Sequence, residues 1–414
     1  MSVDKKYYQP LLISAGLGSI LGSGIIVGLA STITIWQKVL GLTEVQVGLI
    51  SSLLTISIAL GSLSVGFITK KLGLIKSFNY LNTIFVVGTL IIAFSQNLVM
   101  LLIGTVLAGF ISGADLPISL TVISHDAPND KISAELVSGT QIYWTIGILL
   151  ATLVAFATST LGALSAQIVM IVLTILGIVT LVIRNKSERI KEIHAKASQK
   201  VEVEQSGAKV SIFKLLFGNE RKKYLSFFIC ILVFYCGWNL LANTFGQFQT
   251  FMLVKANASQ SFATGAGLIL TIVCLIVAMI FSKIAGGKNR NVAYVVGIII
   301  MAVALIGLAL SGSNLFMIVA WLALQNIGST FAGEAMYKVW TQESFPTEYR
   351  SGIQGFINGF SRLCCSLFAL ITPALVLPNR IRTTMLGFAC LIVVAGIFGL
   401  IQIYLQKKYK IGTN

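Results

Sequence analysis

Twelve apolar stretches, each of about 20 residues or more, recur along this 414-residue chain and constrain its fold more than any other feature. A helix of that length crosses the roughly 30 Å hydrocarbon core of a bilayer. Helices are expected because every backbone N–H and C=O inside lipid must find its partner within the protein. We therefore predict an all-α membrane protein whose twelve transmembrane helices lie near residues 11–36, 45–69, 77–95, 98–124, 137–159, 163–184, 224–250, 259–283, 291–311, 314–340, 351–376 and 384–405.

The low charge content excludes most soluble enzymes. Only 11% of the residues are charged and 56% are hydrophobic, whereas soluble domains carry about 25% charged residues. The sequence contains no G-x-x-x-x-G-K-[ST] phosphate loop. Its two histidines, His125 and His194, lie in predicted loops and form no catalytic or metal-binding pattern. We expect a transporter driven by an ion gradient, not an enzyme, with no cofactor and no metal.

One long hydrophilic segment, residues 185–223, divides the chain into two sets of six spans. We predict a six-helix N-terminal half at 1–184, a cytoplasmic linker at 185–223 and a six-helix C-terminal half at 224–414. Such a layout is typical of a duplicated transporter, with the substrate site expected between the halves. The linker stretch 187–200 has two interpretations, an amphipathic surface helix or a solvated connection.

The basic residues are distributed very unevenly among the predicted loops. With a cytoplasmic N-terminus, 24 of the 30 Lys and Arg residues fall on the inner side and four on the outer side. Cytoplasmic loops carry such an excess, so we predict a multi-pass protein of the cell membrane with both termini cytoplasmic. The same bias explains the net charge of +16 without nucleic acid. The expected partners are a small-molecule substrate, H⁺ and membrane lipid, and we expect a monomer.

Four charged side chains lie within predicted spans: Asp115, Glu334, Lys338 and Arg362. Each costs about 2.5–3.5 kcal/mol at the centre of a membrane helix, so such residues are candidates for function. Asp115 and Glu334 occupy corresponding spans of the two halves and are proton-coupling candidates. Two alternatives stay open: Asp115 is a static partner for a cation such as Arg362, and Glu334 and Lys338, four residues apart, form an internal ion pair.

Amide and aromatic side chains within the spans are candidates for substrate binding, because sugars need many hydrogen-bonding groups and a flat apolar surface. Asn239, Asn243 and Gln247 recur every four residues and should form one polar stripe on the seventh span. The alternative is hydrogen bonding between helices, worth about 0.6 kcal/mol on average. The full set of substrate-binding candidates is Gln141, Trp144, Trp238, Asn239, Asn243, Gln247, Asn326, Asn358 and Arg362.

The stretch from Glu343 to Arg350, E-S-F-P-T-E-Y-R, matches the E-x-F-P-x-x-x-R element of the sugar porters, a family within the major facilitator superfamily. The chain resembles that family over its whole layout. In the first half, His125-Asp126-Ala127-Pro128 resembles the corresponding E-x-A-P, with Lys131 near the expected Arg. The resemblance implies the major facilitator fold and a cytoplasmic gate network that includes Asp126, Lys131, Glu343 and Arg350.

Two further stretches resemble sugar-contacting helices of the family: Gln141 near the start of span five, and Gly237-Trp238-Asn239 in span seven. Other family motifs are altered. Lys70 replaces the Asp of the loop after span two, and the P-E-S-P-R and P-E-T-K-G elements after spans six and twelve are absent. The sequence therefore resembles a divergent member of the family.

We predict a carrier of a small polyhydroxylated solute, a monosaccharide or polyol, that works by proton symport with alternating access. A drug/proton antiporter of the same fold is an alternative, although span five lacks the proline usual in antiporters. Lys338 and Arg362 favour a second alternative, an organic-anion (sugar acid) symporter. A third is a sugar-binding sensor that transports nothing.

Overall fold

The computed structural model describes residues 5–198, 215–218, 220–284 and 289–411. Within these ranges, twelve helical segments are long and apolar enough to cross a membrane, and no strand is present. The predicted all-α fold with twelve spans is confirmed. The observed spans begin and end within a few residues of the predicted ones, for example 98–126 against the expected 98–124.

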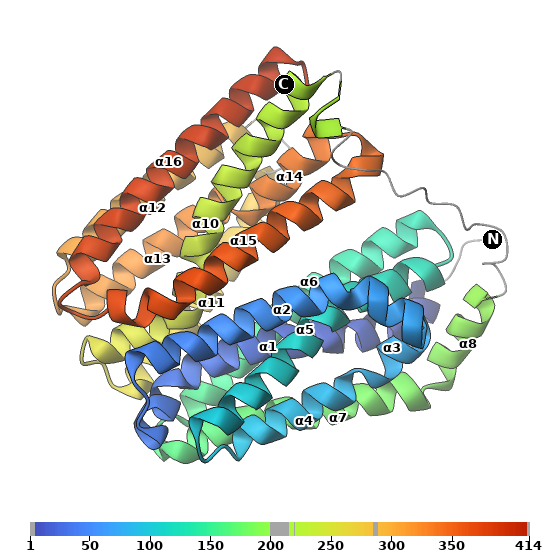
Figure 1. Cartoon of the computed structure of the whole chain (residues 1–414), viewed down its shortest axis with the longest axis horizontal. Helices are drawn as coiled ribbons and strands as arrows, with labels where there is room; N and C mark the ends of the chain where they lie inside the picture. The colour runs from blue at the N-terminus through green and yellow to red at the C-terminus, as the bar shows by residue number, and fades with distance from the viewer. Residues whose placement is uncertain (1–4, 199–214, 219, 285–288, 412–414) are drawn as a thin grey trace. The chain divides into compact units, whose positions relative to one another are not determined.

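The chain forms two compact units, residues 1–207 and 208–414. The N-terminal unit contains η1 (Lys5–Tyr8), α1 (Gln9–Leu40), α2 (Glu44–Leu72), α3 (Leu74–Tyr80), α4 (Asn82–Ala93), α5 (Leu98–Asp126), α6 (Asp130–Ala157), η2 (Ser159–Leu161), α7 (Ala163–Lys186) and α8 (Glu188–Ser198) (Figure 1). Within this unit α1 packs against α6 and α7, and α2 packs against α5.

Short polar turns set where the helices begin. The side chain of Asn97 accepts a hydrogen bond from the backbone N–H of Met100, 3.0 Å away, and thereby caps α5. Asn129 caps α6 in the same way through Ile132, also at 3.0 Å. Such caps satisfy N–H groups that the first turn of a helix leaves without a partner. The cap at Asn97 fixes the start of the helix that carries Asp115.

Glycine allows α2 and α5 to approach closely. A Cβ atom on Gly61 would overlap the carbonyl oxygen of Phe110, and one on Gly113 would overlap the carbonyl oxygen of Ile58. Small residues permit such backbone contact between membrane helices. Gly355 and Gly359 in span eleven lie four residues apart, a spacing common where membrane helices pack closely. No described atom, however, lies within 4 Å of either Cβ position. That pair therefore makes no close packing contact within the C-terminal unit.

The linker prediction included an amphipathic helix near 187–200, and the structure contains α8 at Glu188–Ser198. Its apolar residues Ile190, Ile193 and Ala197 are 0%, 2% and 5% exposed. They pack on the N-terminal unit, where α8 contacts α1 and α5 (Figure 1). The side of α8 opposite these residues is exposed and charged. Residues 199–214 and 219 of the predicted linker lie outside the described part.

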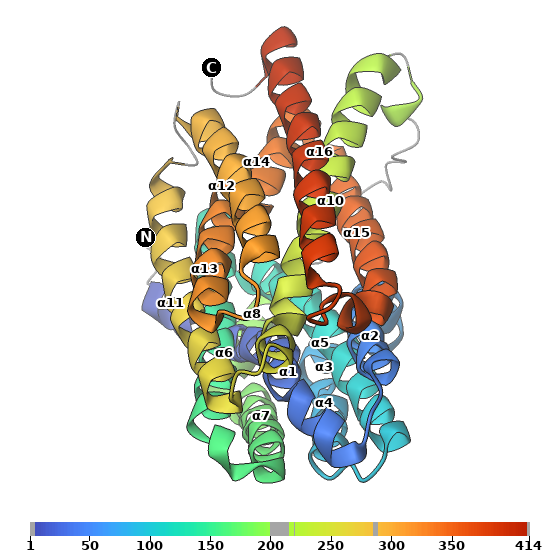
Figure 2. The same cartoon turned by 90° about the vertical axis from the view of Figure 1, so that its left-hand side faces the viewer.

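The C-terminal unit contains α10 (Arg221–Lys255), α11 (Gln260–Ile284), α12 (Arg290–Leu310), α13 (Leu315–Phe331), α14 (Glu334–Ser344), α15 (Thr347–Leu375) and α16 (Ile381–Lys408). Both α13 and α16 pack against α12, and α11 packs against α13 (Figure 2). Trp340 is completely buried among the rings of Phe234 and Tyr294, each 5.0 Å away between centroids. Aromatic side chains thus fill the middle of this unit.

The tenth span is interrupted, whereas the sequence predicted one continuous helix over 314–340. Helix α13 ends at Phe331 and α14 begins at Glu334. Between them Gly333 has φ −124° and ψ −138°, which is not helical. A Cβ atom on Gly333 would also overlap the carbonyl oxygen of Ser329 and approach the indole of Trp238. Interrupted membrane helices occur where backbone groups are buried in protein or face a cavity.

Candidate functional site

Asp115 lies in the middle of α5 and is 2% exposed. Two nitrogens of Arg184 bind its carboxylate: Nη1 donates to Oδ1 at 2.6 Å and Nη2 donates to Oδ2 at 3.0 Å. The amide of Asn82 donates to Oδ1 at 3.3 Å and the hydroxyl of Ser119 donates to Oδ2 at 3.4 Å. Both carboxylate oxygens therefore have two partners, which offsets much of the cost of burying the charge.

Arg184 is only 1% exposed, and uncharged groups also bind its guanidinium. Its Nε donates to the carbonyl of Ser14 at 3.1 Å, and its Nη1 donates to the carbonyl of Phe78 at 2.7 Å. The guanidinium carbon lies 3.9 Å from the centre of the Phe78 ring, a favourable cation–π position. Arg184 thus joins α1 and α3 to α5 and α7.

Gly18 of α1 makes room for this ion pair. A Cβ atom at Gly18 would overlap Oδ2 of Asp115 and lie 2.7 Å from Nη2 of Arg184. Gly18 and Gly22 of α1 lie four residues apart, a spacing common where membrane helices pack closely. The structure shows that Gly18 contacts a buried charge pair instead of a neighbouring backbone.

The sequence left open that Asp115 is a static partner for a cation such as Arg362. Asp115 has a cationic partner in the structure, and that partner is Arg184, which was not among the predicted site residues. A usable signal was present: Leu173, Gly177, Thr180 and Arg184 follow helical spacing and all four are buried. An arginine on the buried face of an apolar helix requires a carboxylate or carbonyl partner.

Asp126, at the end of α5, has both histidines of the chain as partners. Its Oδ1 lies 2.7 Å from Nδ1 of His125, and its Oδ2 lies 2.5 Å from Nδ1 of His194 on α8. The side chain of Asp126 is fully buried. The sequence grouped Asp126 with Lys131, whose side chain lies outside the described part. The described partners of Asp126 anchor α8 to the end of α5.

Phe78 connects the two carboxylate clusters of the N-terminal unit. One contact is the guanidinium of Arg184, described above, and the other is the ring of His194, 6.2 Å away and nearly perpendicular. Phe78 itself is 0% exposed. A continuous series of contacts thus runs from Asp115 through Arg184, Phe78 and His194 to Asp126. None of these contacts links residues adjacent in the sequence.

Two candidate substrate residues of the N-terminal unit, Gln141 and Trp144, lie three residues apart on α6. Trp144 is half-buried, and its ring lies 3.3 Å from the position of a Cβ atom on Gly22. Its backbone carbonyl accepts a hydrogen bond from Ser23 at 2.7 Å, which holds α6 against α1. Gln141, one turn earlier, is exposed on this unit.

The amide stripe of the seventh span lies on α10. Asn239 donates to the hydroxyl of Ser361 on α15 at 2.7 Å, and Gln247 donates to Oδ1 of Asn243 at 2.9 Å. Asn239 and Asn243 are half-buried, while Gln247 is 4% exposed. The stripe therefore retains hydrogen-bonding capacity, because an asparagine amide offers two donors and a two-lone-pair oxygen.

Aromatic rings lie beside the interruption of the tenth span. Tyr235 stacks on Tyr337, with centroids 3.8 Å apart, and on Trp238 at 5.7 Å. The indole nitrogen of Trp238 donates to Ser329 at 2.9 Å. Tyr235 and Tyr337 were not among the predicted site residues. The sequence did hold a signal for them. Tyr235 lies one helical turn before Trp238, and Tyr337 lies one turn after Glu334, so each shares a helix face with a predicted site residue.

The charged groups of the C-terminal unit pair locally. Nζ of Lys338 lies 2.9 Å from Oε1 of Glu334, and their side chains are 50% and 51% exposed. Arg362 is half-buried and donates to Asn358 one turn earlier on α15 at 3.2 Å. Asn326, half-buried on α13, accepts through its backbone carbonyl from Thr330 at 2.8 Å.

Glu343, from the E-x-F-P-x-x-x-R element, pairs with Arg290, the residue just before the predicted span 291–311. Arg290, at the first position of α12, binds it through two nitrogens at 2.7 and 2.9 Å. Gln406 of α16 donates to the same carboxylate at 3.1 Å. Arg350 instead donates to the carbonyl of Phe345 at 2.8 Å. Glu343 thus ties together the ends of α12, α14 and α16.

The family model described as Major Facilitator Superfamily matches residues 12–369 of the chain. The chain belongs to the major facilitator superfamily. It is 26% identical to the minor myo-inositol transporter IolF of Bacillus subtilis over 374 residues, which cover 88% of this chain and 83% of that protein. A shorter match, 31% over 150 residues, is to the glucose transporter GlcP of Staphylococcus epidermidis and covers 36% of this chain and 33% of that one.

The solved structures support the same fold for this major facilitator protein. A crystal structure of a D-xylose-proton symporter matches with a TM-score of 0.79 and 15% identity, over 95% of this chain and 97% of that one. The match to the family model confirms the predicted major facilitator superfamily, and the protein is a multi-pass membrane transporter of a small molecule, not an enzyme.

Proposed function

We propose that this transporter carries a monosaccharide or polyol by proton symport with alternating access. The observation that carries the proposal is the row of amides on α10, Asn239, Asn243 and Gln247, beside the stacked rings of Tyr235 and Trp238. Amides hydrogen-bond to hydroxyl groups, and aromatic faces accept the apolar side of a sugar ring. The names of the relatives, which refer to myo-inositol and glucose, support this class of solute.

The same proposal assigns the remaining polar candidates to substrate contact. Asn358 and Arg362 lie on α15, the helix to which Asn239 is hydrogen-bonded through Ser361. Trp144 and Gln141 supply a ring and an amide from the N-terminal unit, and Asn326 supplies an amide from α13. The two halves are assigned to residues 1–184 and 224–414, joined by 185–223, and the excess of basic residues supports cytoplasmic termini.

Asp115 is proposed as the proton-coupling residue. Arg184 would allow its carboxyl group to gain and lose a proton while buried. When Asp115 is charged, the buried pair is neutral as a whole. When Asp115 takes up a proton, Arg184 keeps the carbonyls of Ser14 and Phe78 and the Phe78 ring as partners. The cation is thus supported in both protonation states of the carboxyl. Glu334 is the second proton candidate and has Lys338 as its partner.

Transport by the purified protein in sealed liposomes tests the proposal. We expect accumulation of labelled myo-inositol, glucose or xylose when the liposome interior is made alkaline relative to the outside. Collapse of the pH gradient with a protonophore should abolish accumulation but leave exchange of labelled for unlabelled solute. Absence of both accumulation and exchange for every sugar and polyol tried would contradict the proposed substrate class.

A sugar acid is a second candidate, favoured by the half-exposed cations Lys338 and Arg362 in the C-terminal unit. A carboxylate on the substrate would compete with Glu334 for Lys338 or bind the guanidinium in two-point fashion. Competition between glucuronate and glucose for uptake separates the candidates. Stronger inhibition by glucuronate than by unlabelled glucose would favour the anion.

A further inference from the structure

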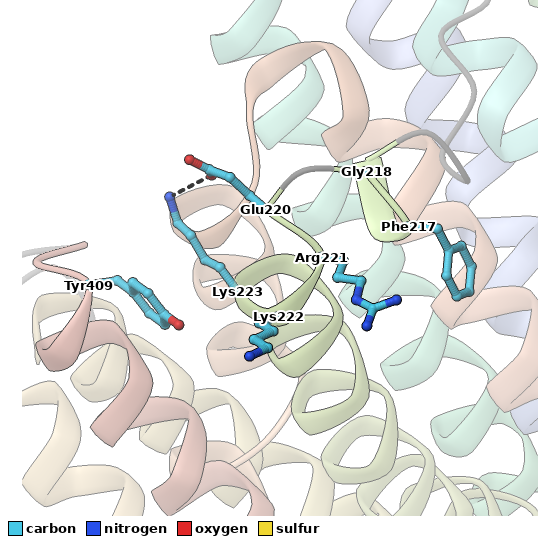
Figure 3. Close-up of a pocket in the computed structure, with 7 residues that line it drawn as sticks. All are labelled: Phe217, Gly218, Glu220, Arg221, Lys222, Lys223 and Tyr409. Carbon is cyan, nitrogen blue, oxygen red and sulfur yellow. Dashed lines mark hydrogen bonds and ion pairs between the residues drawn. The ribbon is translucent and has the colours of Figure 1, made fainter.

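A cavity of about 590 Å³ lies where α10 begins and α16 ends. Its lining residues belong to the C-terminal unit alone and are largely basic or aromatic: Phe217, Gly218, Glu220, Arg221, Lys222, Lys223 and Tyr409. In the close-up, Arg221 and Lys222 lie between the rings of Phe217 and Tyr409, and Lys223 is turned toward Glu220 (Figure 3). No residue of the proposed transport site lines this cavity.

The charges of the cavity are only partly balanced. Nζ of Lys223 lies 3.3 Å from the carboxylate of Glu220. Among the described residues, Arg221 and Lys222 have no carboxylate within ion-pair distance, and both are exposed. Lys407 and Lys408, in the last turn of α16, add positive charge beside Tyr409. The cavity is therefore suited to an anion.

The aromatic wall of the cavity is held by packing within the unit. Tyr409 meets the buried Phe227 of α10 edge to face, with centroids 5.7 Å apart. The ammonium groups of Lys223 and Lys408 each lie 5.8 Å from the centre of the Tyr409 ring. These contacts join α10 to α16 and fix the ring next to the cations.

The cavity lies at one end of two candidate membrane spans. The seventh span begins at Arg221 and the twelfth ends at Lys408, so the basic residues flank the apolar parts of both helices, as residues near lipid headgroups do. Phe217, just before Arg221, is 62% exposed and suited to the boundary between headgroups and acyl chains. Under the proposed orientation this is the cytoplasmic side, where anionic lipids attract basic clusters.

We propose that this cavity binds the phosphodiester headgroup of an anionic phospholipid. Arg221 and Lys222 would bind the phosphate oxygens, Tyr409 would donate its hydroxyl, and Phe217 would contact the first carbons of the acyl chains. A basic cavity between membrane helices at the headgroup level is a recognised form of lipid site. The site is separate from the substrate site, so its failure in a test leaves the transport proposal intact.

Native mass spectrometry of the full-length protein tests the site, with phosphatidylglycerol and phosphatidylcholine supplied in equal amounts. The wild-type protein should retain phosphatidylglycerol selectively. The double variant Arg221→Gln/Lys222→Gln should lose that preference, with affinity reduced roughly tenfold or more, because each basic residue near an anionic membrane surface strengthens binding about fivefold. Inorganic phosphate in excess should displace little lipid, since it lacks the acyl chains.

Lys70→Gln/Lys71→Gln is the matched control, because it removes two basic residues from the end of α2 in the other unit. It should leave phosphatidylglycerol retention near the wild-type value. The proposal is overturned if both double variants lower retention equally, if wild-type protein shows no preference between the two lipids, or if inorganic phosphate displaces the lipid completely. Tyr409→Phe keeps the ring packing and serves if the double variant does not fold. It should weaken phosphatidylglycerol retention, and an unchanged lipid preference in that variant would overturn the proposal.

Discussion

Asp115 and Arg184, 69 positions apart in the sequence, form a two-point ion pair with N–O distances of 2.6 and 3.0 Å inside the N-terminal unit. The pair joins the middle of α5 to the last turn of α7, and Gly18 of α1 leaves the space that it occupies. Neither residue is more than 2% exposed.

Asp115→Asn should abolish proton-driven accumulation while exchange of solute across the membrane continues at a reduced rate. The amide keeps the shape of the carboxyl and can still accept from Arg184, but it cannot take up and release a proton. Liposome uptake with and without a pH gradient measures both activities. Accumulation at the wild-type level in this variant would refute the assignment of Asp115 as the coupling residue.

Arg184→Gln should lower the free energy of unfolding by about 3–5 kcal/mol, because it leaves the buried carboxylate of Asp115 without its cation. The double variant Asp115→Asn/Arg184→Gln should recover much of this loss, since the pair is then uncharged. The apparent melting temperature in detergent checks both. If the double variant is no more stable than Arg184→Gln alone, the ion pair does not account for the loss.

Gly18→Ala should destabilise the protein by about 1–3 kcal/mol and impair uptake, because the added methyl group overlaps the Asp115 carboxylate. Gly66→Ala on α2 is the control, since no described atom lies within 4 Å of its Cβ position. Melting curves of the two variants should differ clearly. Equal melting temperatures would show that the ion pair can shift without cost.

Asn239→Ala and Asn243→Ala should each raise KM for the transported solute roughly threefold to tenfold, the usual effect of losing one hydrogen bond. Ser361→Ala provides the comparison, because it removes the partner of Asn239 within the protein and leaves the amide in place. Initial uptake rates over a range of solute concentrations give KM. A Ser361→Ala effect as large as that of Asn239→Ala would indicate a structural role for the asparagine.

Asp126→Asn should loosen α8 from the N-terminal unit, because the buried carboxylate binds His194 of that helix. Amide hydrogen exchange over Glu188–Ser198 should become roughly tenfold faster, as expected for loss of one charged hydrogen bond. Lys191→Gln, which removes an exposed ion pair with Glu188, should leave the exchange unchanged. Equal exchange in Asp126→Asn and wild type would mean that Ile190 and Ile193 alone hold the helix.

The spans and the fold class could be predicted because they depend on local composition. Each stretch such as 163–184 is apolar enough to favour lipid over water by itself, so its position can be found without knowing its neighbours. The interruption at Gly333 could not be found in this way. It depends on the position of Trp238, whose ring lies beside that glycine from another helix.

The sequence predicted which residues belong to the candidate site, but it predicted only some of the contacts between their side chains. Glu334 and Lys338 pair within one turn of α14, and helical spacing alone indicates such a pair. The partners of Asp115, Asp126 and Glu343 come from α7, α8 and α12, and spacing carries no information about them.

The sequence by itself determined that this protein spans the membrane with twelve helices, and that Asp115, Glu334, Lys338 and Arg362 lie within them. The reason is that transfer into lipid is a property of each segment alone. Only the tertiary structure decided that Arg184 neutralises Asp115 and that Arg290 neutralises Glu343. Electrostatic pairing depends on distances of a few ångströms between side chains from different helices, and these distances are set by the packing of the helices in each unit.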